Sequence, residues 1–358
     1  MNPFTYDQLA ARIVFGAGRL AEVGAEVERL GRQRVMLISD WAATAAAVSV
    51  SGQLGPRLAL PWDEVAQHVP VELADRASSA ATEAKVDCVV CIGGGSSTGL
   101  AKAIALSHSV PIIAVPTTYA GSEQTQIYGL TGGRHKQTGK DPIVQPKTVV
   151  YDPELTVGLP PQVTGPSAFN ALAHSVEALY APGNNPITSA LALEGVRAIH
   201  ESLPTVMASP GDVEARGRLL YGAYLSGVAL GTTSTGLHHK LCHVLGGRFN
   251  LVHADAHSVI LPHAVAFNAP ALPNEMARLA EALGVPGGNP ATALWDLAVA
   301  SNVPTKLAEL HGHDGLLRRE ELPGAAHAAA LEITANPRPV TEADLLGLLE
   351  RAYEGVRP

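Results

Sequence analysis

The stretch that decides the fold is VDCVVCIGGGSSTGLAKAIAL, residues 86–106. Its apolar beginning predicts a buried strand, glycines 93–95 form a loop, and residues 100–106 have the pattern of a helix. This order can hold a phosphate, because glycines let the backbone approach closely and the helix start directs N–H groups at the anion. The loop is neither a G-x-G-x-x-G motif nor a Walker loop, so a tight turn without a ligand is the alternative.

Strand and helix patterns alternate on both sides of this stretch. The expected strands are residues 12–15, 35–38, 88–92, 111–115 and 148–151. Such alternation predicts a parallel sheet with helices on both faces. After residue 160 helical periodicity dominates and strand signals are nearly absent. We therefore predict two domains, an α/β Rossmann-like domain over residues 1–160 and an all-α catalytic or substrate domain over residues 161–358.

The composition excludes several classes of protein. The 358-residue chain is 46% apolar and carries a net charge of -8 without a basic block, which argues against a nucleic-acid partner. No apolar run reaches the roughly 20 residues that span a bilayer, and the N-terminus lacks a signal-peptide pattern. Three cysteines are too few for a disulfide framework. We expect a cytoplasmic protein that does not bind membranes.

Polar residues follow two of the expected strands. Asp40 comes after the strand at 35–38, where a carboxylate can hold an adenosine ribose or can cap the next helix. The loop PTTYAGSE, residues 116–123, follows the strand at 111–115 and is rich in hydroxyl groups. Ligands of open α/β sheets bind at the carboxyl ends of the strands, so both stretches are candidate binding segments.

Histidines are concentrated in the second half of the chain, where six of the 14 lie between residues 238 and 263. His239 and His243 are spaced one helical turn apart, and His253 and His257 repeat that spacing. Such a density of imidazoles suits metal binding, proton transfer or anion recognition.

Two readings of these histidines are open. With Asn170 and His174 from an earlier helix, His239 and His253 could form a Zn or Fe(II) site, although an Asn amide binds a divalent cation more weakly than a carboxylate. Alternatively, some side chains form a cationic pocket for a carboxylate substrate: His238, Lys240, His243, Arg248 and His257. Lys240 could equally be a solvated helix residue.

Together these motifs resemble the iron-containing alcohol dehydrogenase superfamily, which has a dehydroquinate synthase-like fold, and within it the maleylacetate reductases. The resemblance covers nearly the full chain. It rests on FGAG at 15–18, GGGS at 93–96, PTT at 116–118, GSE at 121–123, DP at 152–153, ALAHSVE at 171–177, and the histidine blocks from 239 to 263.

The resemblance implies an NAD(P)-binding first domain, a helical second domain and catalysis in the cleft between them. By position, Gly94, Gly95 and Ser96 hold the pyrophosphate, Asp40 lies near the ribose, and Thr117, Thr118 and Ser122 line the nicotinamide side. NADH is expected because Asp40 would repel a 2′-phosphate, with NADPH as the alternative. The family also suggests a homodimer.

The superfamily's metal ligands, one Asp and three His, fall by position on Asn170, His174, His239 and His253. The Asn at 170 follows the maleylacetate reductase pattern, as do Gly99, Tyr119 in a shortened loop, Lys240 and His257. These departures weaken the case for a bound metal and favour a small dicarboxylate substrate.

The implied reaction is NAD(P)H-dependent reduction of the carbon–carbon double bond of maleylacetate to 3-oxoadipate, in bacterial breakdown of aromatic and chloroaromatic compounds. We predict His243 as proton donor, with His253 second, and a protonated His or Lys240 as stabiliser of the enolate oxygen. The predicted catalytic residues are His174, His239, His243, His253, Lys240 and Tyr119. Three alternatives are a metal-dependent alcohol dehydrogenase acting on a small alcohol or aldehyde, a dehydroquinate synthase-like lyase, and a non-catalytic nucleotide-binding protein.

Overall fold

The computed structural model describes residues 4–7, 11–132, 135–312 and 315–358. The chain forms two compact units. The α/β unit comprises Gln8–Leu159 and Gly211–Leu220, and the helical unit comprises Met1–Asp7, Pro160–Pro210 and Tyr221–Pro358. The predicted boundary lies at residue 160. The two units depart from it at two segments, because residues 1–7 belong to the helical unit and residues 211–220 belong to the α/β unit.

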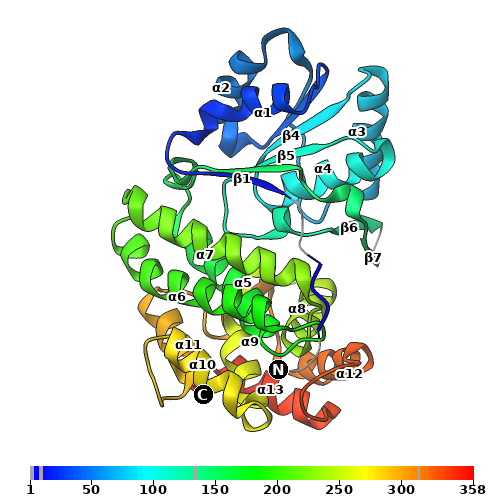
Figure 1. The fold of residues 1–358 in the computed structure, drawn as a ribbon. Helices are drawn as coiled ribbons and strands as arrows, with labels where there is room; N and C mark the ends of the chain where they lie inside the picture. Colours follow the sequence, from blue (N-terminus) through cyan, green and yellow to red (C-terminus); the bar gives the residue numbers. More distant parts are fainter. Residues whose placement is uncertain (1–3, 8–10, 133–134, 313–314) are drawn as a thin grey trace. The chain divides into compact units, whose positions relative to one another are not determined.

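The α/β unit is built on a six-stranded parallel sheet with the order β1-β8-β5-β4-β2-β3 (Figure 1). The strands are β1 Arg12–Phe15, β2 Val35–Ser39, β3 Leu58–Trp62, β4 Cys88–Gly93, β5 Ile112–Pro116 and β8 Thr148–Tyr151. Its four α-helices are α1 Val23–Arg29, α2 Thr44–Leu54, α3 Val71–Glu83 and α4 Gly95–His108. The predicted α/β class and the five predicted strands are confirmed. The sequence did not predict β3, or the antiparallel pair β6 Ile127–Gly132 and β7 His135–Lys140.

The strand β4 lies inside the sheet, between β2 and β5, and all six of its residues are buried. Cys88, Val90 and Ile92 pack in one core cluster with side chains of α1 and α2. Burial raises the pKa of Cys88 and of Cys91 to about 12, so neither thiol is ionised near neutral pH. Cys88 and Cys91, which are spaced as in a C-x-x-C motif, are therefore part of the core.

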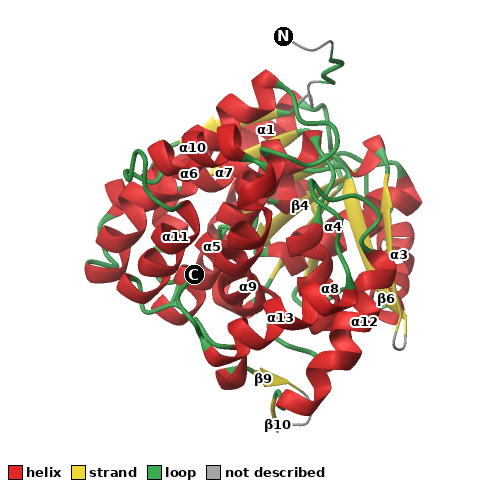
Figure 2. Ribbon diagram, turned by 90° about the horizontal axis from the view of Figure 1, so that it is seen from below, coloured by secondary structure: helices red, strands yellow, loops and turns green. Residues whose placement is uncertain are grey.

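The helical unit carries the remaining helices, and its predicted helical character is confirmed. They are α5 Pro161–Ala178, α6 Pro186–Ala208, α8 Leu237–Phe249, α9 His253–Asn268, α10 Pro273–Ala282, α11 Pro290–Ala300, α12 Leu322–Glu332 and α13 Glu342–Glu354, while α7 Val213–Thr232 has residues in both units. Its two short strands, β9 His311–Gly312 and β10 Gly315–Leu316, form a small antiparallel pair (Figure 2).

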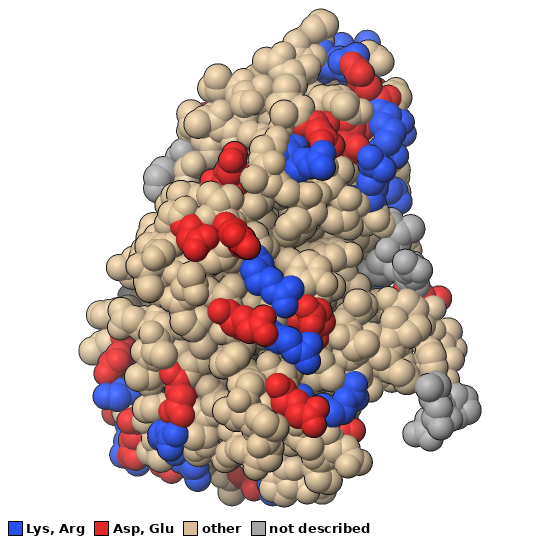
Figure 3. Space-filling model, turned by 60° about the vertical axis from the view of Figure 1, so that its left-hand side comes forward, with Lys and Arg blue, Asp and Glu red and all other residues tan. Residues whose placement is uncertain are grey.

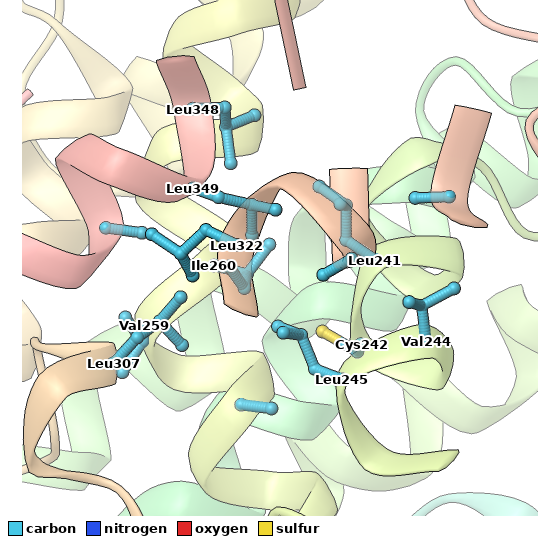
Figure 4. Close-up of a cluster of buried hydrophobic side chains, with 14 of the residues drawn as sticks. Leu241, Cys242, Val244, Leu245, Val259, Ile260, Leu307, Leu322, Leu348 and Leu349 are labelled. Carbon is cyan, nitrogen blue, oxygen red and sulfur yellow. The ribbon is translucent and has the colours of Figure 1, made fainter. Parts of the chain in front are cut away.

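The core of the helical unit joins α8 and α9 to α12 and α13. Figure 4 shows Leu241 and Cys242 of α8 facing side chains of the other helices, including Ile260, Leu322 and Leu349. All five are fully buried. Burial of apolar surface stabilises a fold by about 25 cal/mol per Å². The packing of these side chains therefore holds in place the helices that carry the histidines.

The surface has no large region of one charge on the face shown in Figure 3, where acidic and basic side chains are interspersed. None of the helices in the described ranges is long and apolar enough to cross a membrane.

Candidate active site

The glycine loop of the α/β unit is shaped by close neighbours. Gly93 has φ +147°, and a Cβ there would lie 2.8 Å from Oδ2 of Asp40 and against the hydroxyl of Ser97. A Cβ on Gly94 would lie 3.1 Å from Cγ2 of Thr118. The helix α4 begins at Gly95 without a side-chain cap, so its first N–H groups remain available to an anion. These glycines therefore keep the helix start open, as the phosphate-binding prediction requires.

Asp40 directly follows β2 and lies beside this loop. Its Oδ1 accepts a hydrogen bond of 3.0 Å from the N–H of Ala43, so the helix-cap interpretation is correct. Its Oδ2 faces Gly93, so one oxygen is directed at the loop. The contact between Asp40 and a ribose stays a prediction.

The hydroxyl-rich loop is held against the same helix. The N–H of Thr117 donates to the carbonyl of Gly93 at 3.0 Å, which fixes the start of the loop beside the glycines. The Oγ atoms of Ser97 and Ser122 are buried, and neither has a hydrogen-bond partner within the described ranges. Two hydroxyl groups beside a helix start are suited to contacting a bound anionic cofactor.

Lys102 of α4 is a residue that the sequence predictions missed. The residue is 1% exposed, and its ammonium group donates to the carbonyls of Ser122, Thr125 and Ile127 at 2.7 to 2.8 Å. Burial lowers the pKa of Lys102 to about 7, while the nearby carboxylate of Glu123 opposes that shift. The side chain therefore fastens the far end of the hydroxyl-rich loop to the helix that follows the glycines. A single lysine within the apolar run of α4 was the available signal.

Tyr119 lies in the same loop but points into the protein. Its buried hydroxyl donates to Oγ1 of Thr156 at 3.2 Å and accepts from Nη1 of Arg216 at 3.1 Å. Arg216 also donates to the carbonyls of Val157 and Leu159, which explains why residues 211–220 belong to the α/β unit. The predicted catalytic role of Tyr119 finds no support in this packing arrangement.

The absence of a side chain at position 99 is explained by a close neighbour, Val69, in the segment before α3. A Cβ at this position would lie 2.8 Å from Cγ2 of Val69. Any side chain at this position would therefore displace Val69.

In the helical unit, Glu177 organises the start of the histidine cluster. One carboxylate oxygen lies 2.5 Å from Nδ1 of His239 and accepts from the N–H of Gly236, and the other accepts from the N–H of His238 at 2.7 Å. Burial alone would raise the pKa of Glu177, but His239 and the two backbone donors lower it below its ordinary value. Glu177 therefore caps α8 and fixes the ring of His239. The sequence predictions assigned it no role, because its partners lie about sixty residues away.

The imidazoles form a connected chain. Nε2 of His253 lies 2.9 Å from Nε2 of His257, whose Nδ1 lies 2.8 Å from Nε2 of His238. Burial, reinforced by the neighbouring histidines, lowers the pKa values of His174, His238 and His257 well below the ordinary value. These three rings are therefore neutral at pH 7, and the prediction of a cationic pocket is wrong for two of its members, His238 and His257.

His243 and His253 are the more accessible members of the cluster. His253 is partly buried and His243 is exposed, and their rings stack with centroids 5.7 Å apart at 16°. The structure thus brings the two predicted proton donors together at one end of the imidazole chain.

Lys240 and Arg248 lie against α12. Nζ of Lys240 is 3.8 Å from Oε2 of Glu332, and its side chain is 34% exposed. A Cβ on Gly324 would lie 2.8 Å from a terminal nitrogen of Arg248. For Lys240 the structure favours the solvated-helix interpretation, and neither side chain supplies the cationic pocket that the sequence predicted.

Two of the four predicted metal positions fit a metal ligand. His174 stacks on His239 with centroids 5.1 Å apart. Nδ1 of His174 and Nε2 of His239 are buried without a hydrogen-bond partner in the described part of the chain. A carboxylate behind a histidine, as Glu177 lies behind His239, is typical of a metal-ligating imidazole.

The other two positions fit poorly. Asn170 offers a neutral amide, and Nε2 of His253 already bonds to His257. Among the described residues, the possible ligand atoms that gather within 4.8 Å of one another belong to His238, Cys242 and His257 instead. The predicted set therefore lacks an anionic ligand, and Nε2 of one of its three imidazoles, His253, already has a partner.

Two family models match the chain. The model described as iron-containing alcohol dehydrogenase covers residues 10–153, and that for the C-terminal region of the Fe-containing alcohol dehydrogenase family covers residues 164–353.

Individual relatives match over the full length. A maleylacetate reductase of Burkholderia cepacia is 48% identical over 358 residues, with 100% of each chain covered. Two crystal structures of maleylacetate reductases cover 100% of each chain with a TM-score of 0.94, that from Agrobacterium tumefaciens at 43% identity and that from Rhizobium sp. strain MTP-10005 at 44%. The chain belongs to the iron-containing alcohol dehydrogenase family.

Proposed function

We propose that this protein uses NADH to reduce the carbon–carbon double bond of maleylacetate, giving 3-oxoadipate. The observation that carries the proposal is the full-length similarity, at 48% identity, to a maleylacetate reductase. The site is compatible with this proposal, because Asn170 offers a neutral amide at the position where the superfamily has an anionic metal ligand.

The reaction needs a hydride acceptor and a proton donor. The double bond is conjugated to a carbonyl group, so hydride from the nicotinamide adds to one carbon and leaves an enolate. The enolate carbon then takes a proton, and its oxygen needs hydrogen-bond donors. We assign proton donation to His243 or His253, the accessible members of the cluster. Neutral imidazole N–H groups deeper in the cluster are the available donors to the oxygen.

The cofactor is held by the α/β unit in this proposal. The open start of α4 and the hydroxyl of Ser97 contact the pyrophosphate, and the hydroxyl of Ser122 lies on the nicotinamide side. Asp40 favours NADH, because its Oδ2 lies beside the glycine loop and would repel a 2′-phosphate. We also expect a homodimer, as in the family, which light scattering of the purified protein would test.

The alternative function is oxidation of a small alcohol, or reduction of an aldehyde, with Fe or Zn. Glu177 behind His239 is the observation that favours it. Supplying NADH with either maleylacetate or a series of small aldehydes, and identifying the products, separates the two. We expect NADH oxidation with maleylacetate and formation of 3-oxoadipate. Turnover of aldehydes alone would overturn the proposal.

A further inference from the structure

A cavity lies in the helical unit, between α9 and α13. It has a volume of about 440 Å³ and is lined by His263, Phe267, Arg338, Asp344, Leu348 and Arg351, among others. His263 follows His253 by ten residues on the same helix, which corresponds to about 15 Å along its axis. The cavity is therefore separate from the histidine cluster.

His263 gives this cavity a buried polar atom. The residue is 3% exposed, and its Nε2 has no hydrogen-bond partner within the described ranges. A buried nitrogen left unbonded costs about 1–3 kcal/mol. Burial, and then the charge of Arg351, lower the pKa of His263 to about 4, so the ring is neutral and can present one N–H.

Two guanidinium groups line the same cavity. Arg338 is held in place, because its Nη1 donates to the carbonyl of Phe267 at 3.1 Å and its Cζ lies 4.1 Å from the centre of that ring. No ion pair involves the Arg351 side chain in the part of the chain that the structure describes. Guanidinium groups with spare N–H donors are well suited to binding a carboxylate.

One acidic residue, Asp344, offsets part of this charge. Its Oδ2 accepts from the N–H of Thr341 at 2.9 Å and from the hydroxyl of Thr341 at 2.6 Å, so the carboxylate is engaged in capping α13. Two arginines and one aspartate leave a net charge of +1. The rest of the lining includes the apolar side chains of Phe267 and Leu348.

We propose that this cavity binds a small organic monocarboxylate with an apolar body. The carboxylate bonds to Arg351 and to the remaining donors of Arg338, and accepts from Nε2–H of His263. The apolar part lies against Phe267 and Leu348. The ligand site is independent of the reduction reaction proposed above.

Calorimetric titration of the full chain with sodium benzoate tests this site, with neutral benzamide and inorganic phosphate as comparison probes. We expect benzoate to bind with a Kd at or below about 1 mM, and benzamide and phosphate to bind at least about tenfold more weakly. Arg351→Gln should weaken benzoate binding at least about tenfold, because it removes a charge-assisted bond. The control Arg197→Gln, at a surface ion pair with Glu194 on α6, should bind as the wild type does.

Three results would overturn the proposal. Absence of benzoate binding would do so, as would phosphate binding more tightly than benzoate. Unchanged benzoate affinity in Arg351→Gln would show that benzoate binds at another site, such as the histidine cluster. Thermal unfolding of Arg351→Gln and its rate of maleylacetate reduction show that the variant is folded, since Arg351 lies outside the catalytic machinery. His263→Phe is a second variant, which should also weaken benzoate binding.

Discussion

At the scale of single residues, the carboxylate of Glu177 holds the ring of His239 and the start of α8 in place. Glu177→Gln keeps the shape of the side chain but removes the charge that holds His239 and the start of α8. We expect kcat to fall about 10–100-fold, as for other partners behind a functional histidine, with the KM for NADH unchanged. Steady-state kinetics measure both constants. Glu194→Gln, at a surface ion pair, is the control, and an unchanged kcat in Glu177→Gln would remove the proposed role.

His243 and His253 can be distinguished as proton donors by substitution. The residue that donates the proton should lose about 100-fold in kcat when changed to Ala, because general-acid catalysis contributes about that factor or more. We expect the larger loss in His243→Ala. His327→Ala, at an exposed histidine on α12, is the matched control. Wild-type turnover in His243→Ala would transfer the assignment to His253.

At the scale of elements, Lys102 joins α4 to the hydroxyl-rich loop. Lys102→Met leaves the carbonyls of Ser122, Thr125 and Ile127 without their donor. We expect the free energy of unfolding to fall by about 3 kcal/mol and the KM for NADH to rise more than kcat falls. Denaturant unfolding and kinetics measure these effects, with the exposed Lys147→Met as control. A variant with lower stability but an unchanged KM would show that Lys102 does not position the cofactor loop.

The sequence predicted the buried parallel strands and the helices because their apolar patterns are strong. It did not predict β3, whose residues LALPW include Pro61, since a proline is tolerated only where a strand lies at the edge of a sheet. The strand β6 was missed because two of its six residues are glycine, and β7 was missed because it is polar and also contains a glycine. Glu177 and Lys102 were missed for another reason, as their roles depend on partners that only the fold brings near.

At the scale of the whole molecule, His263 makes stability depend on pH. Its folded-state pKa of about 4 is lower than the ordinary value of 6.5. The unfolded chain therefore binds more protons between these values, and stability falls as pH decreases from 6.5 towards 4. We expect His263 to account for a loss of about 1.6 kcal/mol between pH 6.5 and pH 5. Urea unfolding of the wild type and of His263→Gln at both pH values measures this. Equal losses in the two proteins would contradict the shift.

We propose that this member of the iron-containing alcohol dehydrogenase family reduces maleylacetate without a bound metal. The most direct measurement is the rate of NADH-dependent maleylacetate reduction by protein whose iron and zinc contents have been determined, before and after chelation. We predict full activity at a metal content far below one ion per chain, unchanged by the chelator. Activity that rises in proportion to bound metal, and is lost on chelation and restored by Fe(II) or Zn, would contradict the account.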